Sequence, residues 1–291
     1  MSEPPAKNPA PACTDAWWQD RAGRTWAELA EATDRQLDPL GQMAIACLAP
    51  KSGESVLDIG CGAGQTSLEL GTAVGASGRV LGVDISEALL ARAQERATAA
   101  GASNVTFLRA DAGTHRFAPP PFDGLFSRFG VMFFDDPRTA FANLHAALAP
   151  RSGRLSFVCW QAMERNPWAE LPLRAVQSAL PQLPMPPPLV GAPGPFAFAD
   201  PDHVSSLLAG AGFRAVDIES RTVATNVGGA RTLDEVTDYL MQLGPASRLL
   251  GDADKALRPA ARAAIAQSMA GFAVENGVWC DAAVLLVTAR A

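Results

Sequence analysis

Residues 55–67 combine a short run of strand-forming residues with three closely spaced glycines, and this feature constrains the fold most strongly. The stretch reads SVLDIGCGAGQTS, so the glycines are Gly60, Gly62 and Gly64. A strand that delivers glycines to the start of a helix is typical of nucleotide-type sites, because backbone N–H groups and the positive end of the helix dipole gather there. The ligand of such a site lies beyond the carboxyl ends of the strands.

The sequence around this loop alternates strand-like and helix-like segments. Strands are expected at 55–59, 79–84, 104–109, 122–129 and 153–160, and helices at about 64–74, 86–100 and 135–148. Asp136 as N-cap and Pro137 in the first turn mark the start of the last of these helices, and Asp200 with Pro201 opens a further helix. Repeated strand–helix–strand units predict a doubly wound α/β fold, a mostly parallel sheet with helices on both faces.

The N-terminal part of the chain differs from this pattern. Residues 1–14 are rich in Pro and Ala and are expected to be mobile. Residues 15–50 have apolar side chains at helical spacing, and the pattern restarts after Pro39. We therefore expect a helical cap made of two helices, the second of which begins after this proline.

The remaining residues, 51–291, are expected to form the main domain. The proline-rich stretch within 161–199 predicts an ordered, extended excursion. Strands near 213–222 and 278–289 bring the sheet to seven strands, and a helical insertion over 232–274 separates them.

Composition narrows the partners and the compartment. The formal net charge is −6 and no Lys- or Arg-rich run occurs, so nucleic acid is an unexpected partner. The chain has no export signal and no apolar run that approaches about 18 residues, which favours a cytoplasmic protein without a membrane span. The five cysteines are far apart and form no C-x-x-C pair, so neither a disulfide framework nor a metal site is expected.

The spacing of the glycines excludes two common phosphate-binding motifs. A dinucleotide fingerprint counted from Gly60 would need glycine at Gln65, and one counted from Gly62 would need glycine at Ser67. No Lys-Ser or Lys-Thr pair follows the glycines, so the P-loop also fails. The motif is instead D-x-G-x-G-x-G, in which Asp58 is expected to present a carboxylate to the ligand. A carboxylate there suits an ammonium group better than a phosphate.

Two further acidic residues follow the next two predicted strands. Asp84 closes the second strand, 20 residues beyond Gly64, where a carboxylate can accept both hydroxyl groups of a ribose. Asp111 follows the third strand, where its side chain can accept a hydrogen bond from an exocyclic amine while the Ala112 N–H meets a purine ring. The predicted ligand has an amine, a ribose and an adenine but no phosphate, and S-adenosylmethionine has these features.

On these motifs, together with FDGLFSRF at 122–129 and LAPRSGRLSFVCW at 148–160, the chain resembles the class I S-adenosylmethionine-dependent methyltransferases. The nearest group is that of small-molecule enzymes, which includes the ubiquinone and menaquinone type, and the resemblance covers about 52–160. It implies a Rossmann-like fold, methyl transfer to a small and fairly apolar acceptor, and a position for Ser127 beside the sulfonium. It also implies that the cap at 15–50 and the insertion at 232–274 act as lids over the substrate. The expected cofactor-binding residues are Asp58, Gly60, Cys61, Gly62, Gly64, Gln65, Thr66, Asp84, Ile85, Asp111, Ala112 and Ser127.

Two other functions are weighed against this one. A nicotinamide-dependent oxidoreductase is disfavoured by the glycine spacing. A regulatory protein that binds the cofactor on the same fold without transferring the methyl group stays open. The sequence indicates neither the methylated atom nor the oligomeric state.

Catalytic residues are harder to predict, because alignment and the exclusion of water can supply much of the rate of methyl transfer. Where a base is needed, histidine is the usual choice. His115 follows the third strand and is the candidate, with a surface role as the alternative. His145 is expected to flank the core, and His203 is expected to be solvated.

The end of the fourth strand and the segment after it supply the second candidate catalytic residue, Arg128, and the candidate substrate residues. Arg128 either grips a substrate carboxylate or fixes a loop, or else forms an ion pair with Asp135 or Asp136. The faces of aromatic rings attract the positive charge of a sulfonium and also suit an apolar acceptor, although core packing alone would also explain the aromatic residues here. The expected substrate pocket consists of Trp17, Trp18, Phe129, Met132 and Phe133.

Overall fold

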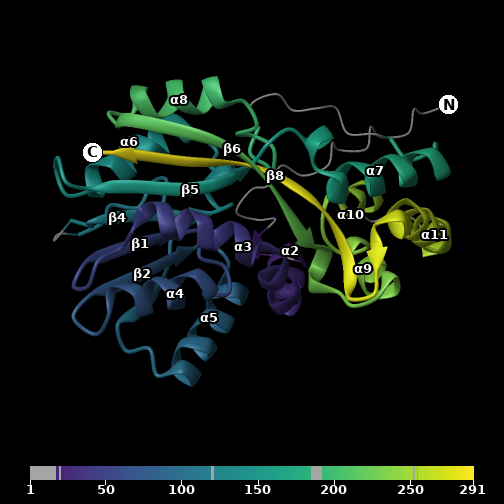
Figure 1. Cartoon of the computed structure of the whole chain (residues 1–291), viewed down its shortest axis with the longest axis horizontal. Coiled ribbons are helices and arrows are strands. Elements are labelled where there is room, and N and C mark those ends of the chain that lie inside the picture. Colours follow the sequence, from purple (N-terminus) through teal and green to yellow (C-terminus); the bar gives the residue numbers. More distant parts are fainter. Residues whose placement is uncertain (1–17, 20, 119–120, 185–191, 252, 254) are drawn as a thin grey trace, which may run out of the picture.

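The computed structural model describes residues 18–19, 21–118, 121–184, 192–251, 253 and 255–291. Its centre is a sheet in the order β3-β2-β1-β4-β5-β8-β6 (Figure 1). The strands are β1 (Ser55–Ile59), β2 (Arg79–Asp84), β3 (Val105–Arg109), β4 (Gly124–Arg128), β5 (Arg154–Trp160), β6 (Arg214–Asn226) and β8 (Gly277–Arg290). Neighbours among β1 to β5 are parallel, and β8 is antiparallel to both β5 and β6. The predicted fold class, a mostly parallel seven-stranded sheet, is confirmed. A two-residue strand that the sequence did not predict, β7 (Ala273–Val274), also pairs with β8.

Helices cover both faces of this sheet. They are α3 (Ala30–Leu48), α4 (Gln65–Val74), α5 (Glu87–Ala100), α6 (Pro137–Ala147) and α8 (Pro201–Gly210). Two other helices lie beside them: α2 (Arg21–Glu28) packs against α5, and α7 (Pro167–Ala179) lies beyond the end of β5. Two successive residues of β5 show the layering. The Ser156 hydroxyl donates to the Ala44 carbonyl of α3 (2.8 Å), whereas the Phe157 ring lies 5.9 Å from Phe141 of α6. Because successive strand residues point to opposite faces, α3 and α6 lie on opposite sides of the sheet.

Helix α3 corrects one prediction. The boundary between the two cap helices lies at Leu29, between α2 and α3, and α3 continues through Pro39 instead of beginning after it. A proline inside a helix removes one backbone hydrogen bond and costs about 3 kcal/mol. Here Leu40 and Leu48 of the same helix are buried in the core, and each buried leucine side chain stabilises the fold by about 1.5–3 kcal/mol. Burial therefore outweighs the cost of the proline.

The helix starts predicted from capping residues are confirmed. Asp136 accepts a hydrogen bond from the Thr139 N–H at the start of α6, and Asp200 accepts one from the Asp202 N–H at the start of α8. In both helices a proline occupies the first turn. These short-range signals are local, so they survive in the folded chain.

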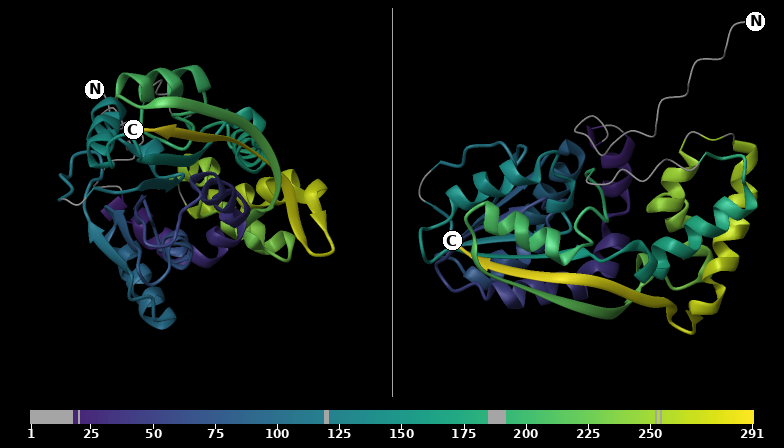
Figure 2. Two further views of the ribbon diagram at one scale, coloured as in Figure 1. Left: turned by 60° about the vertical axis from the view of Figure 1, so that its left-hand side comes forward. Right: turned by 90° about the horizontal axis from the view of Figure 1, so that it is seen from above.

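The segment between β6 and β8 is helical. It contains α9 (Leu233–Leu240), α10 (Pro245–Leu250) and α11 (Arg258–Met269). These helices gather with α7 at one end of the molecule, strands β1 to β5 lie at the other end, and the long strands β6 and β8 run from one end toward the other (Figures 1 and 2). The molecule therefore has a second layer of helices beyond the sheet edge.

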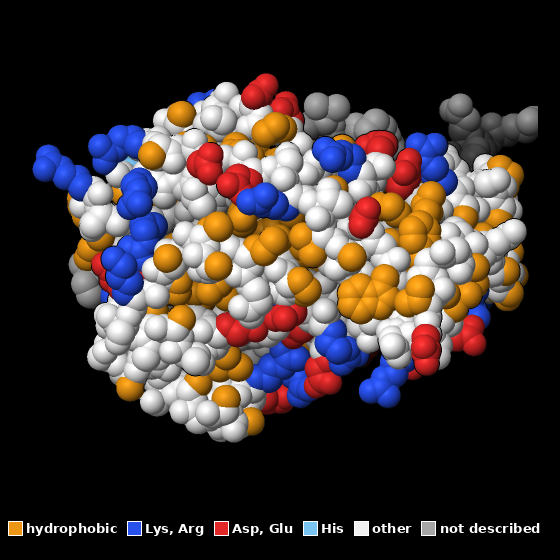
Figure 3. All heavy atoms as spheres, viewed as in Figure 1, with side chains coloured by type: hydrophobic (Ala, Val, Ile, Leu, Met, Phe, Trp, Pro, Cys, Tyr) orange, Lys and Arg blue, Asp and Glu red, His pale blue; other side chains and the backbone are white. Residues whose placement is uncertain are grey.

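Residues 1–17 and 185–191 lie outside the described residues, so the predictions for the first 14 residues, for Trp17 and for part of the proline-rich excursion are not addressed. None of the helices in the described ranges is both long and apolar enough to cross a membrane. The four cysteines in the described part of the chain are free, and no group of three metal-binding side chains is found there. On the face shown in Figure 3, basic and acidic side chains are mixed over the lower centre and the upper right, and several basic side chains gather along the left-hand edge.

Candidate active site

The three glycines of the loop after β1 are needed for two different reasons. Gly60 has a φ of +66°, and a Cβ atom there would lie 2.7 Å from the Cα of Gly130. Gly64 is the N-cap of α4, and a Cβ atom there would lie 2.8 Å from the Cβ of Ala93. Gly62 has a φ of +54°, but a Cβ atom there would meet nothing within 4 Å. Two of the glycines permit close packing, and Gly62 alone faces open space.

Asp84 fixes this loop to the end of β2. One carboxylate oxygen accepts the Gly62 N–H (2.9 Å), and the other accepts the Ser86 N–H (2.8 Å). Burial raises the pKa of Asp84, whereas these backbone hydrogen bonds lower it. The carboxylate therefore stands beside the one glycine that faces open space.

The acidic residue predicted at the end of β3, Asp111, lies at the same sheet edge. Asp111 accepts hydrogen bonds from the Gly113 N–H (2.8 Å) and from the Thr114 hydroxyl (2.7 Å). The Ala112 carbonyl accepts a hydrogen bond from the Asn143 amide (3.1 Å), while no acceptor for the Ala112 N–H is found among the described residues. That N–H group is free to meet a ligand.

One cavity of about 1520 Å³ joins these groups. It is walled by the carboxyl ends of the strands, the cap helices α2 and α3, α7, residues 192–200 and the helices of the insertion. The predicted residues that line it are Trp18, Gly60, Cys61, Gly62, Thr66, Asp84, Ile85, Asp111, Ala112, Arg128, Phe129, Met132 and Phe133.

The sequence predicted that the Asp58 carboxylate faces the ligand, but in the structure Asp58 does not line the cavity. Its side chain is fully buried, and one oxygen accepts the hydroxyls of Thr66 (2.8 Å) and Ser67 (2.6 Å) at the start of α4. Its other oxygen is buried without a hydrogen-bond partner among the described residues. Strand β1 is buried on both faces, so its pattern does not reveal which side chains point toward a ligand.

Three more of the predicted cofactor residues lie off the cavity. The Ser127 hydroxyl is buried, donates to the Ile59 carbonyl (2.7 Å) and accepts the Gly130 N–H (3.1 Å), so it braces the loop instead of facing a ligand. Gln65 faces a separate surface hollow next to the cap, because its amide is held by residues of α3 and α4. Gly64 is covered by α5.

The histidines are also absent from the cavity wall. His115, the predicted base, is half-buried and packs against Phe117, with the ring centroids 4.9 Å apart, so it does not line the cavity. The His145 ring lies 4.9 Å from that of Phe213 and flanks the core, and His203 is exposed, both as predicted. Sequence reasoning missed Trp160, Trp168 and Tyr239, which line the cavity from β5, α7 and α9. Only Trp160 gave a signal, because it ends a strand at the same sheet edge.

The sequence comparisons agree with this geometry. A family model described as a methyltransferase domain matches residues 56–151. The aklanonic acid methyltransferase DauC of Streptomyces sp. strain C5 is 34% identical over 119 residues, which cover 41% of this chain and 54% of DauC. The chain thus spans about half the length of that relative. The uncharacterized protein Mb1438c of Mycobacterium bovis is 30% identical over 248 residues, or 84% of this chain and 81% of that protein. The chain belongs to the class I S-adenosylmethionine-dependent methyltransferases.

A solved structure shows the same fold as this methyltransferase. Phosphoethanolamine N-methyltransferase 2 of Haemonchus contortus, in complex with S-adenosyl-L-methionine, superposes with a TM-score of 0.58 at 18% identity, covering 95% of this chain and 60% of that one. The matched family model ends before β5. The cap, α7 and the insertion, which form much of the cavity wall, therefore lie outside it.

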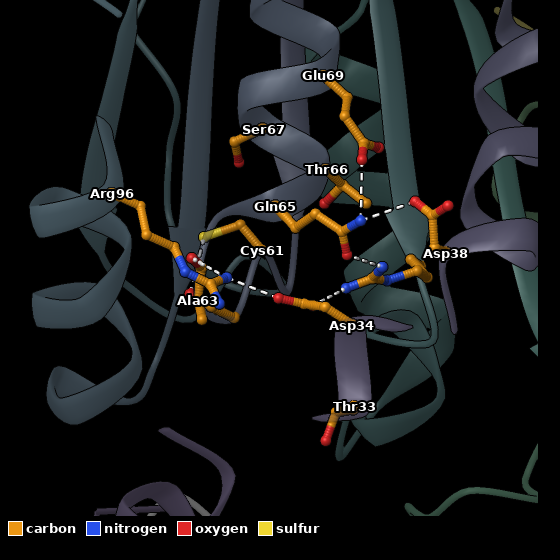
Figure 4. Close-up of polar contacts among 12 residues, drawn as sticks. Thr33, Asp34, Asp38, Cys61, Ala63, Gln65, Thr66, Ser67, Glu69 and Arg96 are labelled. Carbon is orange, nitrogen blue, oxygen red and sulfur yellow. Dashed lines mark hydrogen bonds and ion pairs between the residues drawn. The ribbon is translucent and has the colours of Figure 1, made fainter. Parts of the chain in front are cut away.

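Arg128 of the methyltransferase joins the cap to the sheet. Its guanidinium donates to Asp34 of α3 (2.7 Å) and to the Gln65 side-chain oxygen (2.7 Å). The same Asp34 carboxylate accepts Arg96 of α5 (2.6 Å), which also donates to the Ala63 carbonyl in the glycine loop (3.2 Å; Figure 4). An ion pair was one of the predicted roles for Arg128, but its partner is in the cap instead of in the loop after β4.

This pairing predicts a measurable coupling between the two residues. The Arg128 and Asp34 side chains are only 11% and 14% exposed. In a double-mutant cycle with Arg128→Gln and Asp34→Asn, urea unfolding is expected to give a coupling energy of about 2 kcal/mol. The matched control is the pair Arg262 and Asp234, whose side chains are 42% and 82% exposed and should couple by about 0.5 kcal/mol or less. Equal coupling energies in the two cycles would contradict a stabilising role for the buried ion pair between Arg128 and Asp34.

Asp58 predicts a pH dependence of stability. Burial raises the pKa of Asp58 from 3.8 to about 6. Between these two pH values the folded protein therefore keeps a proton that the unfolded chain has lost. The contribution of this proton to the free energy of unfolding is complete below pH 3.8 and is lost as the pH rises through about 6. Between about pH 4.5 and about pH 7, the free energy of unfolding should fall by about 2 kcal/mol through this group.

The variant Asp58→Asn removes this titration. The difference in free energy of unfolding between wild type and variant, measured by urea unfolding without cofactor, should change by the same amount over that range. Other titrating groups, including Glu69, are present in both proteins and cancel in the difference. A difference that is independent of pH would show that the Asp58 carboxyl ionises normally.

Proposed function

We propose that this methyltransferase transfers the methyl group of S-adenosylmethionine to a small, largely apolar molecule. The observation that carries the proposal is that one cavity is lined both by the glycine loop with its strand-end acids and by a group of aromatic side chains. Its volume of about 1520 Å³ exceeds the range of about 300–1,000 Å³ that is usual for one ligand. It therefore has room for a cofactor and an acceptor together. By its name, the relative DauC also acts on a small molecule.

The residues at the strand ends fit the nucleoside half of this cofactor. Each oxygen of Asp84 accepts one backbone N–H, but a carboxylate has about four lone-pair sites. Asp84 can therefore accept the two ribose hydroxyls as well. Asp111 and the free Ala112 N–H suit the adenine, and the open space at Gly62 suits close approach of a ligand to the backbone.

The aminoacyl half needs a partner for an ammonium and one for a carboxylate. We place Asp34 beside the ammonium and Arg128 beside the carboxylate, because both residues line the cavity and present opposite charges. Asp58, which the sequence suggested for the ammonium, reaches the cavity only through the hydroxyl of Thr66. When bound, S-adenosylmethionine supplies an electrophilic methyl group on a positively charged sulfur.

The chain contributes to the reaction mainly through alignment. The cap and the insertion close over the acceptor part of the cavity in this proposal and exclude water, which strengthens the interactions inside. Because no histidine of the described residues lines the cavity, the acceptor is one that needs no histidine base.

Methyl-labelled S-adenosylmethionine tests the proposal. The protein is incubated with it and with a panel of phenols, enols, amines and thiols, and the products are separated by chromatography. We expect label in at least one apolar acceptor, together with release of S-adenosylhomocysteine. Binding of the cofactor without transfer to any acceptor class would support the alternative, a regulatory protein.

A further inference from the structure

Three aromatic side chains form a continuous wall of the cavity, which we call the aromatic wall: Phe129, Trp160 and Trp168. The rings of Phe129 and Trp160 are stacked, with their centroids 4.2 Å apart and an angle of 14° between the planes. Trp168 follows, 4.8 Å from Trp160. Its indole N–H donates to the Asn166 side chain (3.3 Å), which fixes the ring. Such a wall is rigid and favours contact with another flat ring.

The backbone at Phe129 is strained in order to place this ring. Phe129 has a φ of +62°, a region that costs a residue with a Cβ atom about 1–2 kcal/mol. Of the four non-glycine residues with positive φ in the described part of the chain, it is the one that lines the cavity. Strain at a ligand-facing position points to a function, because packing alone would select a relaxed backbone.

The strained residue also connects the wall to the glycine loop. Directly after Phe129 comes Gly130, whose Cα would lie 2.7 Å from a Cβ atom placed on Gly60. The Phe129 N–H donates to the Val158 carbonyl of β5 (3.0 Å), the strand that ends in Trp160. The aromatic wall therefore begins where the proposed cofactor position ends.

The charged groups of the cavity restrict how the acceptor can lose a proton. The aspartates that line the cavity, apart from Asp135, already accept hydrogen bonds within the protein: these are Asp34, Asp84, Asp111, Asp136 and Asp200. Groups that titrate near neutral pH are the usual bases, and no histidine among the described residues lines this cavity. An acceptor that ionises readily by itself fits such a site.

We propose that the acceptor is a planar conjugated ring that bears an acidic hydroxyl group, such as a phenol or an enol, and that it packs against the aromatic wall. This inference rests on the proposed function and narrows it. The hydroxyl proton is released to solvent before transfer. A lone pair of the resulting oxyanion then forms the new O–C bond as the S–C bond breaks, and that electron pair stays on sulfur as the thioether.

Binding to the complex with S-adenosylhomocysteine tests this without any transfer. The probes are 2-naphthol and alizarin, which are flat with acidic hydroxyls, and decahydro-2-naphthol, which has the skeleton of 2-naphthol without its conjugation. Quenching of tryptophan fluorescence and calorimetry measure the affinities. We expect the flat compounds to bind at least about tenfold more tightly than the saturated alcohol.

Variants of the wall sharpen the test. Trp160→Leu should weaken the binding of 2-naphthol by about tenfold and leave S-adenosylhomocysteine affinity unchanged. Phe129→Leu is a second variant of the wall if the first does not fold. Trp279→Leu is the matched control, because Trp279 is 42% exposed and does not line the cavity.

The outcomes separate this inference from the function on which it rests. Equal affinity for saturated and flat alcohols, or an unchanged affinity for 2-naphthol in both wall variants, would overturn the inference alone. Label transfer to an amine or a thiol in preference to every phenol would also overturn it. Failure of S-adenosylhomocysteine to bind the wild-type protein would instead overturn the proposed function.

Discussion

Replacing Asp84 with alanine is expected to weaken the binding of S-adenosylmethionine by about 100-fold. A hydrogen bond to a charged group contributes about 1.5–3 kcal/mol, and two bonds to the ribose hydroxyls together give about 3 kcal/mol or more. The change also releases the Gly62 N–H, which Asp84 holds at 2.9 Å in the folded loop. Calorimetric titration with S-adenosylmethionine and S-adenosylhomocysteine measures the effect.

The matched control is Asp123→Ala. This carboxylate also accepts a backbone N–H, that of Ser55 at 2.9 Å. However, Asp123 directly precedes β4, at the amino ends of the strands, and does not line the cavity. The control should bind the cofactor as the wild type does. A folded Asp84→Ala variant whose affinity matches that of the control would contradict the role of Asp84.

The second large effect is expected for Gly62→Ala, which should weaken cofactor binding by at least about tenfold while lowering stability by only about 1 kcal/mol. The added methyl group meets no protein atom within 4 Å, so it occupies space that we assign to the ligand. The small loss of stability comes from the φ of +54°, which alanine adopts with strain. Calorimetry and urea unfolding measure the two effects separately.

Gly101→Ala controls for the strain alone. Gly101 ends α5 with a φ of +63°, and a Cβ atom there also meets nothing within 4 Å. Both variants should lose similar stability, and only Gly62→Ala should lose affinity. If both variants bind S-adenosylmethionine as the wild type does, the cofactor does not approach Gly62.

Much of the sheet could be predicted because its signals are local. The strands around the glycine loop were placed within about two residues of their observed bounds, and Asp136 and Asp200 cap the helices that they were predicted to start. Turn and capping chemistry acts over a few residues, so it can be read without knowing the tertiary structure.

Side-chain direction at the sheet edge could not be predicted equally well. Asp58, Gln65 and Ser127 lie in the predicted segments, but their side chains point into the protein or toward the cap. A strand buried on both faces shows no alternation, so the sequence does not indicate which of its residues face the ligand.

Contacts between segments far apart in the chain could not be predicted from the sequence either. The partner of Arg128 is Asp34, 94 residues away, and Trp168 and Tyr239 reach the cavity from elements outside the family model. Helix α3 passes Pro39 only because the sheet buries one side of it. In each case tertiary packing decides, and no local pattern reports it.

The most direct test of the account is calorimetric titration of the wild-type protein with S-adenosylmethionine, S-adenosylhomocysteine and NADH. The account predicts that the first two bind, at one molecule per chain, and that NADH does not. Binding of NADH with no response to either sulfur compound would contradict the claim that this glycine loop and its strand-end acids select an aminoacyl adenosine over a dinucleotide.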